Sequence, residues 1–354
     1  FLMNEMISNK RTFFKVKNFT IGKPGKVFVI AEIGINHNGD FAKCKRLIFA
    51  ASRAGADAAK IQTIDVDESY TENSQSYKVF KNKNFSNNEL IKLKNYANSL
   101  EIVFFSTPGD LKSLTRLIKI KMPIIKISSG LATNFPLIGE VLKKKIPIII
   151  STGFSTKNDL IDLKKFLKKF KSKKIVLLKC TSNYPANPNS IDLNSIKFLK
   201  NEFNLSAGYS DHTLGDVAPI VAVSLGATVI EKHFTLNKQQ EGGDHKISME
   251  PKEFEIMVKK IRLTEKMLGK GIFELNEEIK KKRKMFLRCL VAKKEIQKGD
   301  IFSLDNIGFL RHPKGNLGLE PKYFYELKKK KSKIKLKKGE IFKSKYIKLH
   351  KKKL

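Results

Sequence analysis

The sequence predicts a (β/α)8 barrel followed by a small, mostly β domain. Eight short, apolar, β-branched runs lie between residues 27 and 235, of the kind that form parallel strands covered on both faces. Amphipathic stretches of helical period separate these runs, and eight strand–helix units in about 240 residues favour a closed barrel over an open sheet. The alternation stops near Gly271, where short strand-like runs and turn residues begin.

The predicted elements follow one another in a regular order. The eight strands are residues 27–36, 58–63, 102–108, 124–130, 147–153, 175–182, 205–213 and 228–235. Helical patterns cover residues 89–99, 135–144, 157–170, 192–203, 216–226 and 250–269, and several begin with a helix-starting residue, such as Asn134 ahead of Pro136. The expected domains are an N-terminal cap (1–26, a hairpin or loose segment), the barrel (27–270), a charged linker helix (271–285) and the small domain (286–354).

Composition places the chain among ordinary globular proteins long enough for two domains, with 354 residues, 41% of them hydrophobic and 29% charged. No apolar run approaches the ~18 residues that a membrane span needs, and the N-terminal stretch lacks the apolar segment of a signal peptide. Cys44, Cys180 and Cys289 are odd in number and far apart, which fits a reducing cytoplasm better than a disulfide framework. We therefore expect a cytoplasmic protein with no membrane partner.

The formal net charge of +36, from 70 Lys and Arg against 34 Asp and Glu, is typical of proteins that bind polyanions. Here the lysines are spread along the whole length, and aromatic residues are not interleaved with the lysine runs as a base-stacking surface requires. A nucleotide-composition bias explains the surplus equally well. We do not expect nucleic acid as a partner, although a basic nucleic-acid-binding protein on a barrel scaffold is the alternative of another class.

Polar side chains stand at every predicted strand end, where the reactive residues of a (β/α)8 barrel are found. They are Glu32; Lys60 and Gln62, on one side of their strand; Thr107; Lys126 and Ser129; Ser151; Ser182 and Tyr184; Ser210 and His212; Glu231 and His233. Two lysines ringed by hydroxyl groups and glycines suit an anion such as phosphate. Two other roles are open for Lys126: an ion pair with a carboxylate such as Glu32 or Glu231, and a Schiff base as in aldolases.

Three of the six histidines are close in sequence: His212 ends the seventh strand, His233 ends the eighth, and His245 follows Asp244. Neutral imidazole is a common ligand of divalent metal ions, so His212 and His233, on adjacent strands, could share one ion. The alternative is that each ring only hydrogen-bonds a loop carbonyl. A metal beside a phosphate pocket would suit a phosphorylated, carboxylate-bearing substrate that reacts with a metal-polarised carbonyl.

The motifs at these strand ends closely resemble those of the sialic acid synthase (N-acetylneuraminate synthase) family. The resemblance runs in order through residues 31–39, 55–63, 105–108, 126–130, 151–153, 180–185, 210–213, 231–235 and 243–249. Residues 291–300 look like part of the antifreeze-like (SAF) domain of that family. The resemblance implies the same fold class as the element pattern: a (β/α)8 barrel with a small SAF domain.

The resemblance also implies an activity, the condensation of phosphoenolpyruvate with an N-acylated hexosamine, typically N-acetylmannosamine, to a nine-carbon 2-keto sugar acid and phosphate. His212 and His233 would hold Mn²⁺ or Mg²⁺, and Glu32 would assist proton transfer or hold the reacting groups. The residues implied to bind phosphoenolpyruvate are Lys60, Thr107, Lys126, Ser129, Ser151, Ser182 and Ser210, and those implied to position the sugar are Gln62, Tyr184, Glu231 and Asp244. The implied catalytic set is Glu32, Lys60, Lys126, His212 and His233. Arg311 matches a small-domain arginine that enters the partner subunit's active site, which implies a domain-swapped homodimer.

Three positions depart from the family pattern. Leu131 stands where the family usually has a glutamate, Gly109 replaces a phenylalanine, and Gly243 replaces a proline. The lysine, metal and phosphate positions are retained, so we expect the chemistry to be intact. Because a carboxylate is missing beside the expected sugar pocket, the alternative acceptor is a diacetamido-dideoxyhexose of the kind that leads to legionaminic or pseudaminic acid.

Overall fold

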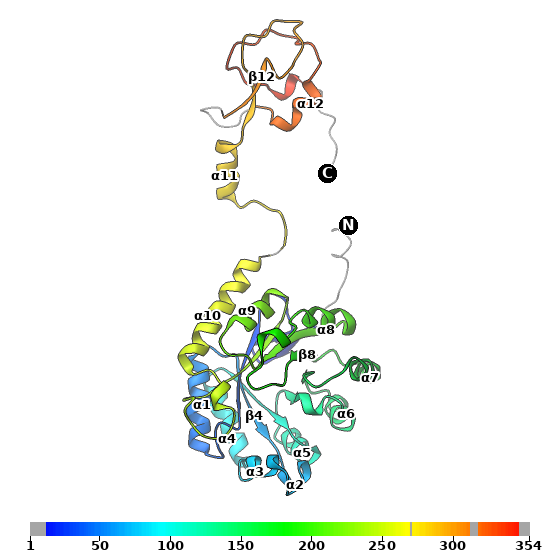
Figure 1. The fold of residues 1–354 in the computed structure, drawn as a ribbon, viewed down its shortest axis with the longest axis vertical. Helices are drawn as coiled ribbons and strands as arrows, with labels where there is room; N and C mark the ends of the chain where they lie inside the picture. The colour runs from blue at the N-terminus through cyan, green and yellow to red at the C-terminus, as the bar shows by residue number, and fades with distance from the viewer. Residues whose placement is uncertain (1–11, 270, 312–317, 347–354) are drawn as a thin grey trace. The chain divides into compact units, whose positions relative to one another are not determined.

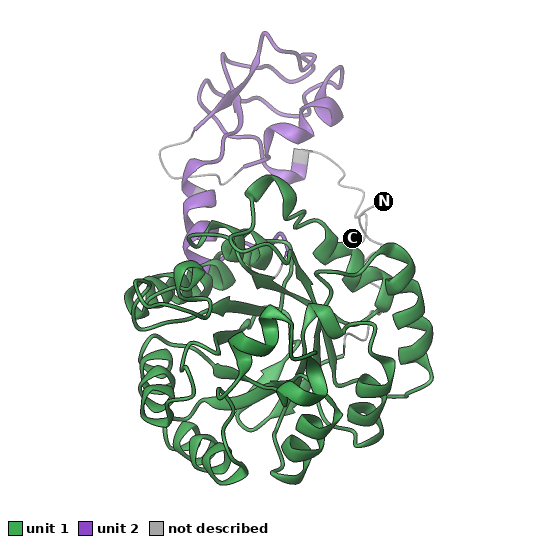
Figure 2. Ribbon diagram, turned by 60° about the horizontal axis from the view of Figure 1, so that its bottom comes forward, with its two compact units in different colours: residues 1–270 green, residues 271–354 purple. Residues whose placement is uncertain are grey.

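The computed structural model describes residues 12–269, 271–311 and 318–346 of the chain. The chain divides into two compact units, residues 1–270 and 271–354 (Figures 1 and 2). A closed barrel of parallel strands in the order β10-β3-β4-β5-β6-β7-β8-β9 forms the first unit. Strands adjacent in sequence are thus adjacent in space, and the last strand closes onto the first. The predicted (β/α)8 barrel is confirmed.

Each barrel strand lies inside one of the eight predicted runs. The strands are β3 (Phe28–Gly34), β4 (Ala58–Thr63), β5 (Val103–Pro108), β6 (Ile125–Ile127), β7 (Ile148–Ser151), β8 (Ile175–Cys180), β9 (Ser206–Asp211) and β10 (Val229–His233). Most are shorter than predicted at the C-terminal end. There the chain leaves the sheet, so that Ser129, Ser182 and His212 lie just beyond their strands.

Helices connect the strands on the outside of the barrel. They are α1 (Phe41–Arg53), α2 (Val66–Ser69), α3 (Gln75–Phe80), α4 (Asn87–Ser99), α5 (Leu111–Lys119), α6 (Phe135–Lys143), α7 (Lys157–Lys168), α8 (Ser195–Phe203), α9 (Val217–Ser224) and α10 (Pro251–Leu268). The helix predicted to start at residue 192 begins at Ser195 instead. Asp192 has a positive φ of 42°, and a turn there precedes the helix.

Local sequence sets where several helices begin. The side chain of Asp40 accepts a hydrogen bond from the amide of Lys43 at the start of α1. Ser86 and Glu89 form a reciprocal capping box at α4, which satisfies amide groups that the first helical turn leaves without partners. These caps explain why each chain segment leaves the rim of the barrel at a defined residue.

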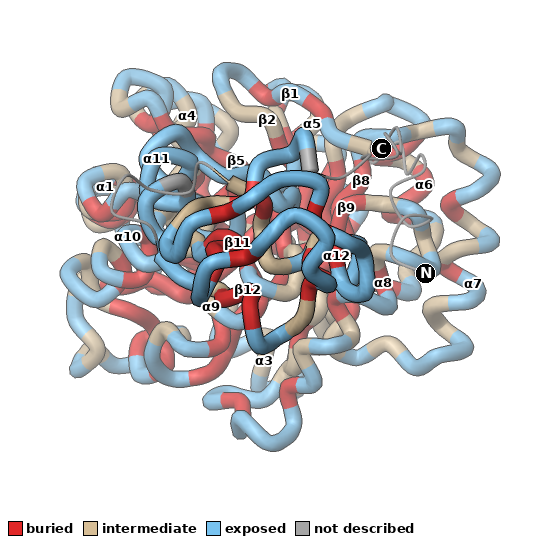
Figure 3. The backbone as a smooth tube through the Cα atoms, turned by 90° about the horizontal axis from the view of Figure 1, so that it is seen from above, coloured by how far each residue is buried: buried red, intermediate tan, exposed pale blue. Residues whose placement is uncertain are grey.

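Apolar side chains fill the barrel and the layer between barrel and helices. The buried residues of the chain are the red segments of the tube in Figure 3. The strands of the barrel are buried on both faces. In β7, for example, Ile148, Ile149 and Ile150 are all fully buried. Side chains alternate in direction along each strand. On β10, Glu231 and His233 line the cavity at the C-terminal end of the barrel. Lys232, between them in sequence, does not line the cavity and forms an ion pair with Asp211.

Outside the barrel, the predicted N-terminal cap contains a hairpin of β1 (Phe14–Val16) and β2 (Phe19–Ile21). In the second unit, α11 (Glu277–Phe286) precedes an antiparallel pair, β11 (Cys289–Ala292) and β12 (Ile307–Leu310). A short helix, α12 (Phe324–Leu327), and three-residue helical turns complete it. Its own apolar cluster includes Leu290, Ile296 and Phe342. A small unit with an antiparallel strand pair thus follows the barrel, as the sequence predicts.

Two composition-based expectations can be compared with the fold. Within residues 12–269, 271–311 and 318–346, no helix is long and apolar enough to cross a membrane. All three cysteines are free and buried.

Candidate active site

A cavity of about 450 Å³ opens at the C-terminal end of the barrel strands. It brings together every predicted site residue of the barrel: Glu32, Lys60, Gln62, Thr107, Lys126, Ser129, Ser151, Ser182, Tyr184, Ser210, His212, Glu231, His233 and Asp244. The remaining predicted residue, Arg311, belongs to the second unit, where its guanidinium lies 4.8 Å from the centre of the Phe286 ring.

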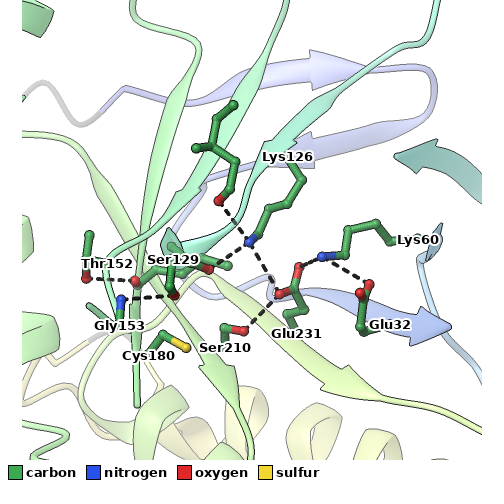
Figure 4. Close-up of polar contacts among 12 residues, drawn as sticks. Glu32, Lys60, Lys126, Ser129, Thr152, Gly153, Cys180, Ser210 and Glu231 are labelled. Atoms are coloured by element: carbon green, nitrogen blue, oxygen red, sulfur yellow. Dashed lines mark hydrogen bonds and ion pairs between the residues drawn. The ribbon is translucent and has the colours of Figure 1, made fainter. Parts of the chain in front are cut away.

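Four buried charged side chains in the cavity form a continuous series of ion pairs (Figure 4). Lys60 Nζ lies 3.0 Å from Glu32 Oε2 and 3.1 Å from Glu231 Oε2. Lys126 Nζ lies 3.5 Å from the other oxygen of Glu231, Oε1. None of the four residues is more than 4% exposed. Two ammonium groups and two carboxylates therefore compensate one another at a position where isolated charges would be very costly.

The strand register produces this arrangement. Glu32 on β3 is the direct neighbour of Lys60 on β4, and Glu231 on β10 is the direct neighbour of Ser210 on β9. The Ser210 hydroxyl donates a hydrogen bond of 2.8 Å to Glu231 Oε1. Because β10 also pairs with β3, closure of the barrel places Glu231 beside Lys60, which is 171 positions earlier in the sequence.

The two carboxylates differ in their protonation. Burial raises the pKa of Glu32 from 4.5 to about 7, with Glu231 adding to the rise and Lys60 opposing it. Burial acts on Glu231 in the same direction, but the ammonium groups of Lys126 and Lys60 outweigh it and lower the pKa of Glu231 to about 2. At neutral pH, Glu231 is therefore a fixed counterion, while Glu32 can take up or release a proton.

The ammonium of Lys126 is held by hydrogen bonds as well as by charge. Its Nζ donates to Ser151 Oγ at 2.7 Å and to the carbonyl of Ile127 at 3.1 Å. Burial lowers the pKa of Lys126, against the attraction of Glu231. On the neighbouring strand β5, Thr107 Oγ1 is buried and has no hydrogen-bond partner within the described part of the chain. A fixed cation therefore lies in the same cavity as an unused hydroxyl, which is a suitable arrangement for an anionic ligand.

A second group of donors lies after β6, β7 and β8. The Gly153 amide donates to Ser129 Oγ at 3.0 Å. A Cβ atom on Gly153 would lie 2.4 Å from Ser182 Oγ and 2.7 Å from Ser129 Oγ, closer than real side chains approach. Glycine at this position therefore allows the two hydroxyl groups to converge.

The two histidines lie side by side, with ring centres 5.2 Å apart. His212 Nδ1 is 2.8 Å from the carbonyl of Thr181, and a carbonyl only accepts, so Nδ1 carries the proton and leaves Nε2 available. His233 Nδ1 lies 3.5 Å from Asp244 Oδ2 and makes no hydrogen bond among the described residues. Tyr184 stacks on His212 at 4.2 Å between ring centres.

The donor set can be tested for a metal ion. Burial lowers the pKa of His233 far below 6.5, so this ring is neutral, as a ligand must be. At His212, burial also favours the neutral ring, but interactions with Cys180 and the Thr181 carbonyl outweigh it and raise the pKa, so a metal would compete with a proton. No cluster of three or more His, Cys, Asp or Glu suited to a metal is found among the residues that the structure describes. Two imidazoles fit a divalent ion whose other ligands come from water or substrate.

The sequence analysis missed the apolar residues of the cavity wall. Ile64, Tyr70, Phe80 and Phe154 line the cavity together with Leu131, and the rings of Tyr70 and Phe80 stack at 5.5 Å. Tyr70 and Phe80 come from the segment between β4 and α4, which contains only the short helices α2 and α3. No local pattern connects these two rings with the strand ends. The only feature of the sequence that could have indicated their contact is the presence of two aromatic residues, Tyr70 and Phe80, ten positions apart.

Several known proteins are similar to this chain in sequence and in fold. Residues 47–273 match the NeuB family, and residues 288–345 match the SAF domain. The chain is 38% identical over 302 residues to an N,N′-diacetyllegionaminic acid synthase of Legionella pneumophila, covering 80% of this chain and 85% of that protein. It is 36% identical over 343 residues to a pseudaminic acid synthase of Campylobacter jejuni, covering 93% and 98%. The crystal structure of an N-acetylneuraminic acid (sialic acid) synthetase from Leptospira borgpetersenii in complex with citrate is similar, with a TM-score of 0.73, 34% identity, and coverage of 77% of this chain and 95% of that one.

Proposed function

The chain belongs to the NeuB family, and we propose on this basis that it is an enzyme that condenses phosphoenolpyruvate with an N-acylated hexosamine to a nine-carbon 2-keto sugar acid. The observation that carries the proposal is the juxtaposition, in one cavity, of a lysine- and hydroxyl-lined anion site with two adjacent histidines. The first half suits the phosphate and carboxylate of phosphoenolpyruvate. The second half suits a metal that polarises an aldehyde.

The residues around Lys126 would bind phosphoenolpyruvate. Lys60 and Lys126 would face its negative charges, and the hydroxyls of Thr107, Ser129, Ser151 and Ser182 would donate to its oxygens. The Ser210 hydroxyl lines the same cavity, but it donates to Glu231 and would hold that carboxylate in place. In a buried site these interactions are stronger than in water, and they favour the departure of phosphate. A Schiff-base role for Lys126 is less well supported. Its ammonium is already fixed by Ser151 and Glu231, and the mechanism proposed here requires no covalent intermediate.

His212 and His233 would hold Mn²⁺ or Mg²⁺, and the bound metal would make the sugar aldehyde more electrophilic. Gln62, Tyr184 and Asp244 would position the sugar. Glu231, which the resemblance groups with them, would instead act as the counterion of Lys60 and Lys126.

As C3 of phosphoenolpyruvate bonds to the aldehyde carbon, the aldehyde oxygen gains a proton, and water that adds at C2 loses one. Glu32, with a pKa near neutrality, would carry a proton between these groups. The C–O bond to phosphate then breaks, the C2 hydroxyl gives its proton to the departing phosphate, and the 2-keto group remains.

The proposal is tested by phosphate release from phosphoenolpyruvate with a panel of N-acylated hexosamines, with and without EDTA. We expect release that requires both a sugar and a divalent metal. His212→Ala should abolish turnover, and phosphoenolpyruvate should still stabilise this variant against heat because the anion site is intact. If no sugar in the panel supports metal-dependent release, the proposed reaction is wrong; if His212→Ala retains turnover, the ligand assignment is wrong.

A second acceptor is favoured by the apolar wall of the cavity. Leu131 stands where the family usually has a glutamate, and Ile64, Phe80 and Phe154 line the same cavity. Acyl methyl groups and deoxygenated carbons would be better accommodated there than a fully hydroxylated sugar. We therefore expect a higher kcat/KM with a diacetamido-dideoxyhexose than with N-acetylmannosamine. Leu131→Glu should shift the ratio of the two values toward N-acetylmannosamine by about 10-fold or more. An unchanged ratio would show that Leu131 does not select the acceptor.

The family resemblance further suggests a homodimer in which Arg311 completes the partner subunit's site. Mixing subunits tests this suggestion without a structure of the dimer. His212→Ala and Arg311→Ala are each expected to be inactive, and a swapped mixed dimer contains one site with both residues intact. After subunit exchange about a quarter of the wild-type activity should return. No recovery under conditions where subunits exchange would refute the exchange of Arg311 between sites.

A further inference from the structure

Asn36 is a fully buried polar residue that has no role in the chemistry proposed above. It lies two positions after β3, in the turn that follows Glu32. A buried amide needs hydrogen-bond partners for its two donors and its acceptor, and the identity of those partners shows what it holds together.

The amide of Asn36 connects three segments of the chain. Its Nδ2 donates to the carbonyl of Phe234 at 3.0 Å and to Ser248 Oγ at 3.1 Å, and its Oδ1 accepts from the amide of Asp244 at 2.9 Å. A carbonyl can only accept and a main-chain amide can only donate, so these partners define the orientation of the side chain. Phe234 directly follows the metal-ligand candidate His233.

Two further contacts complete this arrangement around Asp244. Ser248 is 1% exposed, and its hydroxyl donates to the carbonyl of Asp244 at 2.7 Å. Gly243 has a φ of +55°, and a Cβ atom there would lie 2.6 Å from Asn36 Oδ1. The main chain of Asp244 is thus held at its amide by Asn36 and at its carbonyl by Ser248. The residue before it must be glycine for Asn36 to approach.

The carboxylate of Asp244, in contrast, is not fixed by its own contacts. His233 Nδ1 lies 3.5 Å from one of its oxygens, and no hydrogen bond to the carboxylate is found within residues 12–269, 271–311 and 318–346. The side chain is 31% exposed and lines the cavity. Its place opposite His233 therefore depends on the main chain that carries it.

We infer that Asn36, together with Ser248, is a positioning residue that sets the Asp244 carboxylate against His233 in the acceptor half of the site. The same amide donates to the Phe234 carbonyl, so it ties the loop of Asp244 to the segment that follows His233. The kinetic consequences of this inference rest on the proposed function, whereas the structural consequence does not.

The structural consequence is tested by hydrogen exchange of the intact protein. The amide of Asp244 donates to Asn36 in the wild type and should be protected. In Asn36→Ala its exchange should be at least about 10-fold faster, with exchange in β6 and β7 unchanged. Ser248→Ala, a milder change, should accelerate exchange in the same loop and serves if Asn36→Ala does not fold. Unchanged exchange at Asp244 in a folded Asn36→Ala protein would overturn the inference.

The kinetic consequence is tested by a double-mutant cycle. In the wild-type background, Asn36→Ala should lower kcat/KM for the acceptor by about 10- to 100-fold. In an Asp244→Ala background it should lower this value by less than about 2-fold, because the carboxylate that Asn36 positions is already absent there. The KM for phosphoenolpyruvate should stay within about 2-fold in each protein. Effects that multiply across the two backgrounds would overturn the inference.

A matched control separates positioning from general stability. Ser206, at the start of β9, is a buried serine like Ser248 and does not line the cavity. Its hydroxyl donates to the carbonyl of Thr12 at 2.6 Å and also lies 3.0 Å from the carbonyl of Gly22. Ser206→Ala should lower Tm without any coupling to Asp244→Ala. If Ser206→Ala couples to Asp244 as strongly as Asn36→Ala does, the positioning role is wrong. Absence of turnover in the wild type would instead refute the proposed function, and the exchange measurement would still decide the role of Asn36.

Discussion

Replacement of Glu231 by Gln gives opposite expected effects on the free and the ligand-bound protein. Glu231 lies 3.1 Å from Lys60 and 3.5 Å from Lys126, and it accepts a hydrogen bond from Ser210. With all groups ionised, the site contains two ammonium groups and two carboxylates. The substitution keeps the shape of the side chain and leaves one buried positive charge without compensation.

The free protein should be less stable because removal of one partner from a buried ion pair costs about 3–5 kcal/mol. For 150–250 residues, each kcal/mol shifts Tm by about 2–4 °C, so we expect Tm to fall by about 6–20 °C at pH 7. Phosphoenolpyruvate is an anion and would neutralise the surplus charge. It should therefore raise the Tm of Glu231→Gln by more degrees than it raises the Tm of the wild type. Differential scanning calorimetry with and without the ligand measures both effects.

Two further proteins make the result decisive. Lys126→Met combined with Glu231→Gln restores the charge balance, so part of the lost Tm should return and the additional response to phosphoenolpyruvate should disappear. Glu202→Gln breaks an exposed pair with Lys164 and should leave Tm nearly unchanged. A Glu231→Gln protein with the wild-type Tm, or with a smaller response to phosphoenolpyruvate, would refute the view that Glu231 is the counterion of the two lysines.

Three other predictions concern pH, a buried ion pair and a glycine. The pKa of Glu32 is raised from 4.5 to about 7, so the folded protein holds this proton more tightly than the unfolded chain does. Relative to Glu32→Gln, the free energy of unfolding of the wild type should therefore fall by about 3 kcal/mol as pH rises from 4 to 8. If the difference in free energy of unfolding between the two proteins does not change with pH, the pKa of Glu32 is not raised. The side chains of Lys232 and Asp211 are fully buried and paired at 2.5 Å. In denaturant titrations, Lys232→Met should lower the free energy of unfolding by about 3–5 kcal/mol, more than the loss of any exposed ion pair does. A smaller change would show that this buried pair contributes little to stability. In calorimetric titrations, Gly153→Ala should bind phosphoenolpyruvate about 10-fold more weakly than the wild type, because the added methyl group displaces Ser182. The circular dichroism spectrum should be nearly unchanged. If the variant binds with wild-type affinity, this part of the cavity does not belong to the anion site.

The strands and most helices could be predicted from the sequence because their signals are local. The run at 147–153 contains three consecutive isoleucines, and a strand buried on both faces needs such a run, as β7 shows. Residues at the ends of the strands were also found, since the barrel topology fixes the edge at which strand ends meet. The start of α8 was predicted three residues early because the turn at Asp192 depends on its backbone conformation, which the helical pattern does not reveal.

The contacts within the site could not be predicted in the same way. The pairing of Lys60 with Glu32 follows from the register of β4 against β3. Its pairing with Glu231 depends on the register of β10 against β3, which is set only when the barrel closes. Tyr70 and Phe80 reach the cavity from the segment between β4 and α4, whose path follows tertiary packing rather than local periodicity.

The sequence by itself determined the barrel, the small second domain and the residues at the strand ends, because hydrophobic periodicity and strand-end position are properties of neighbouring residues. The tertiary structure alone decided which of those residues form ion pairs and which of them titrate near neutral pH. Glu231 is held ionised between two lysines, Glu32 titrates near neutrality, and Asn36 holds the loop of Asp244. The physical reason is that desolvation and Coulomb interactions act through space between groups far apart in the chain, and both terms are fixed only after the barrel has closed and excluded water.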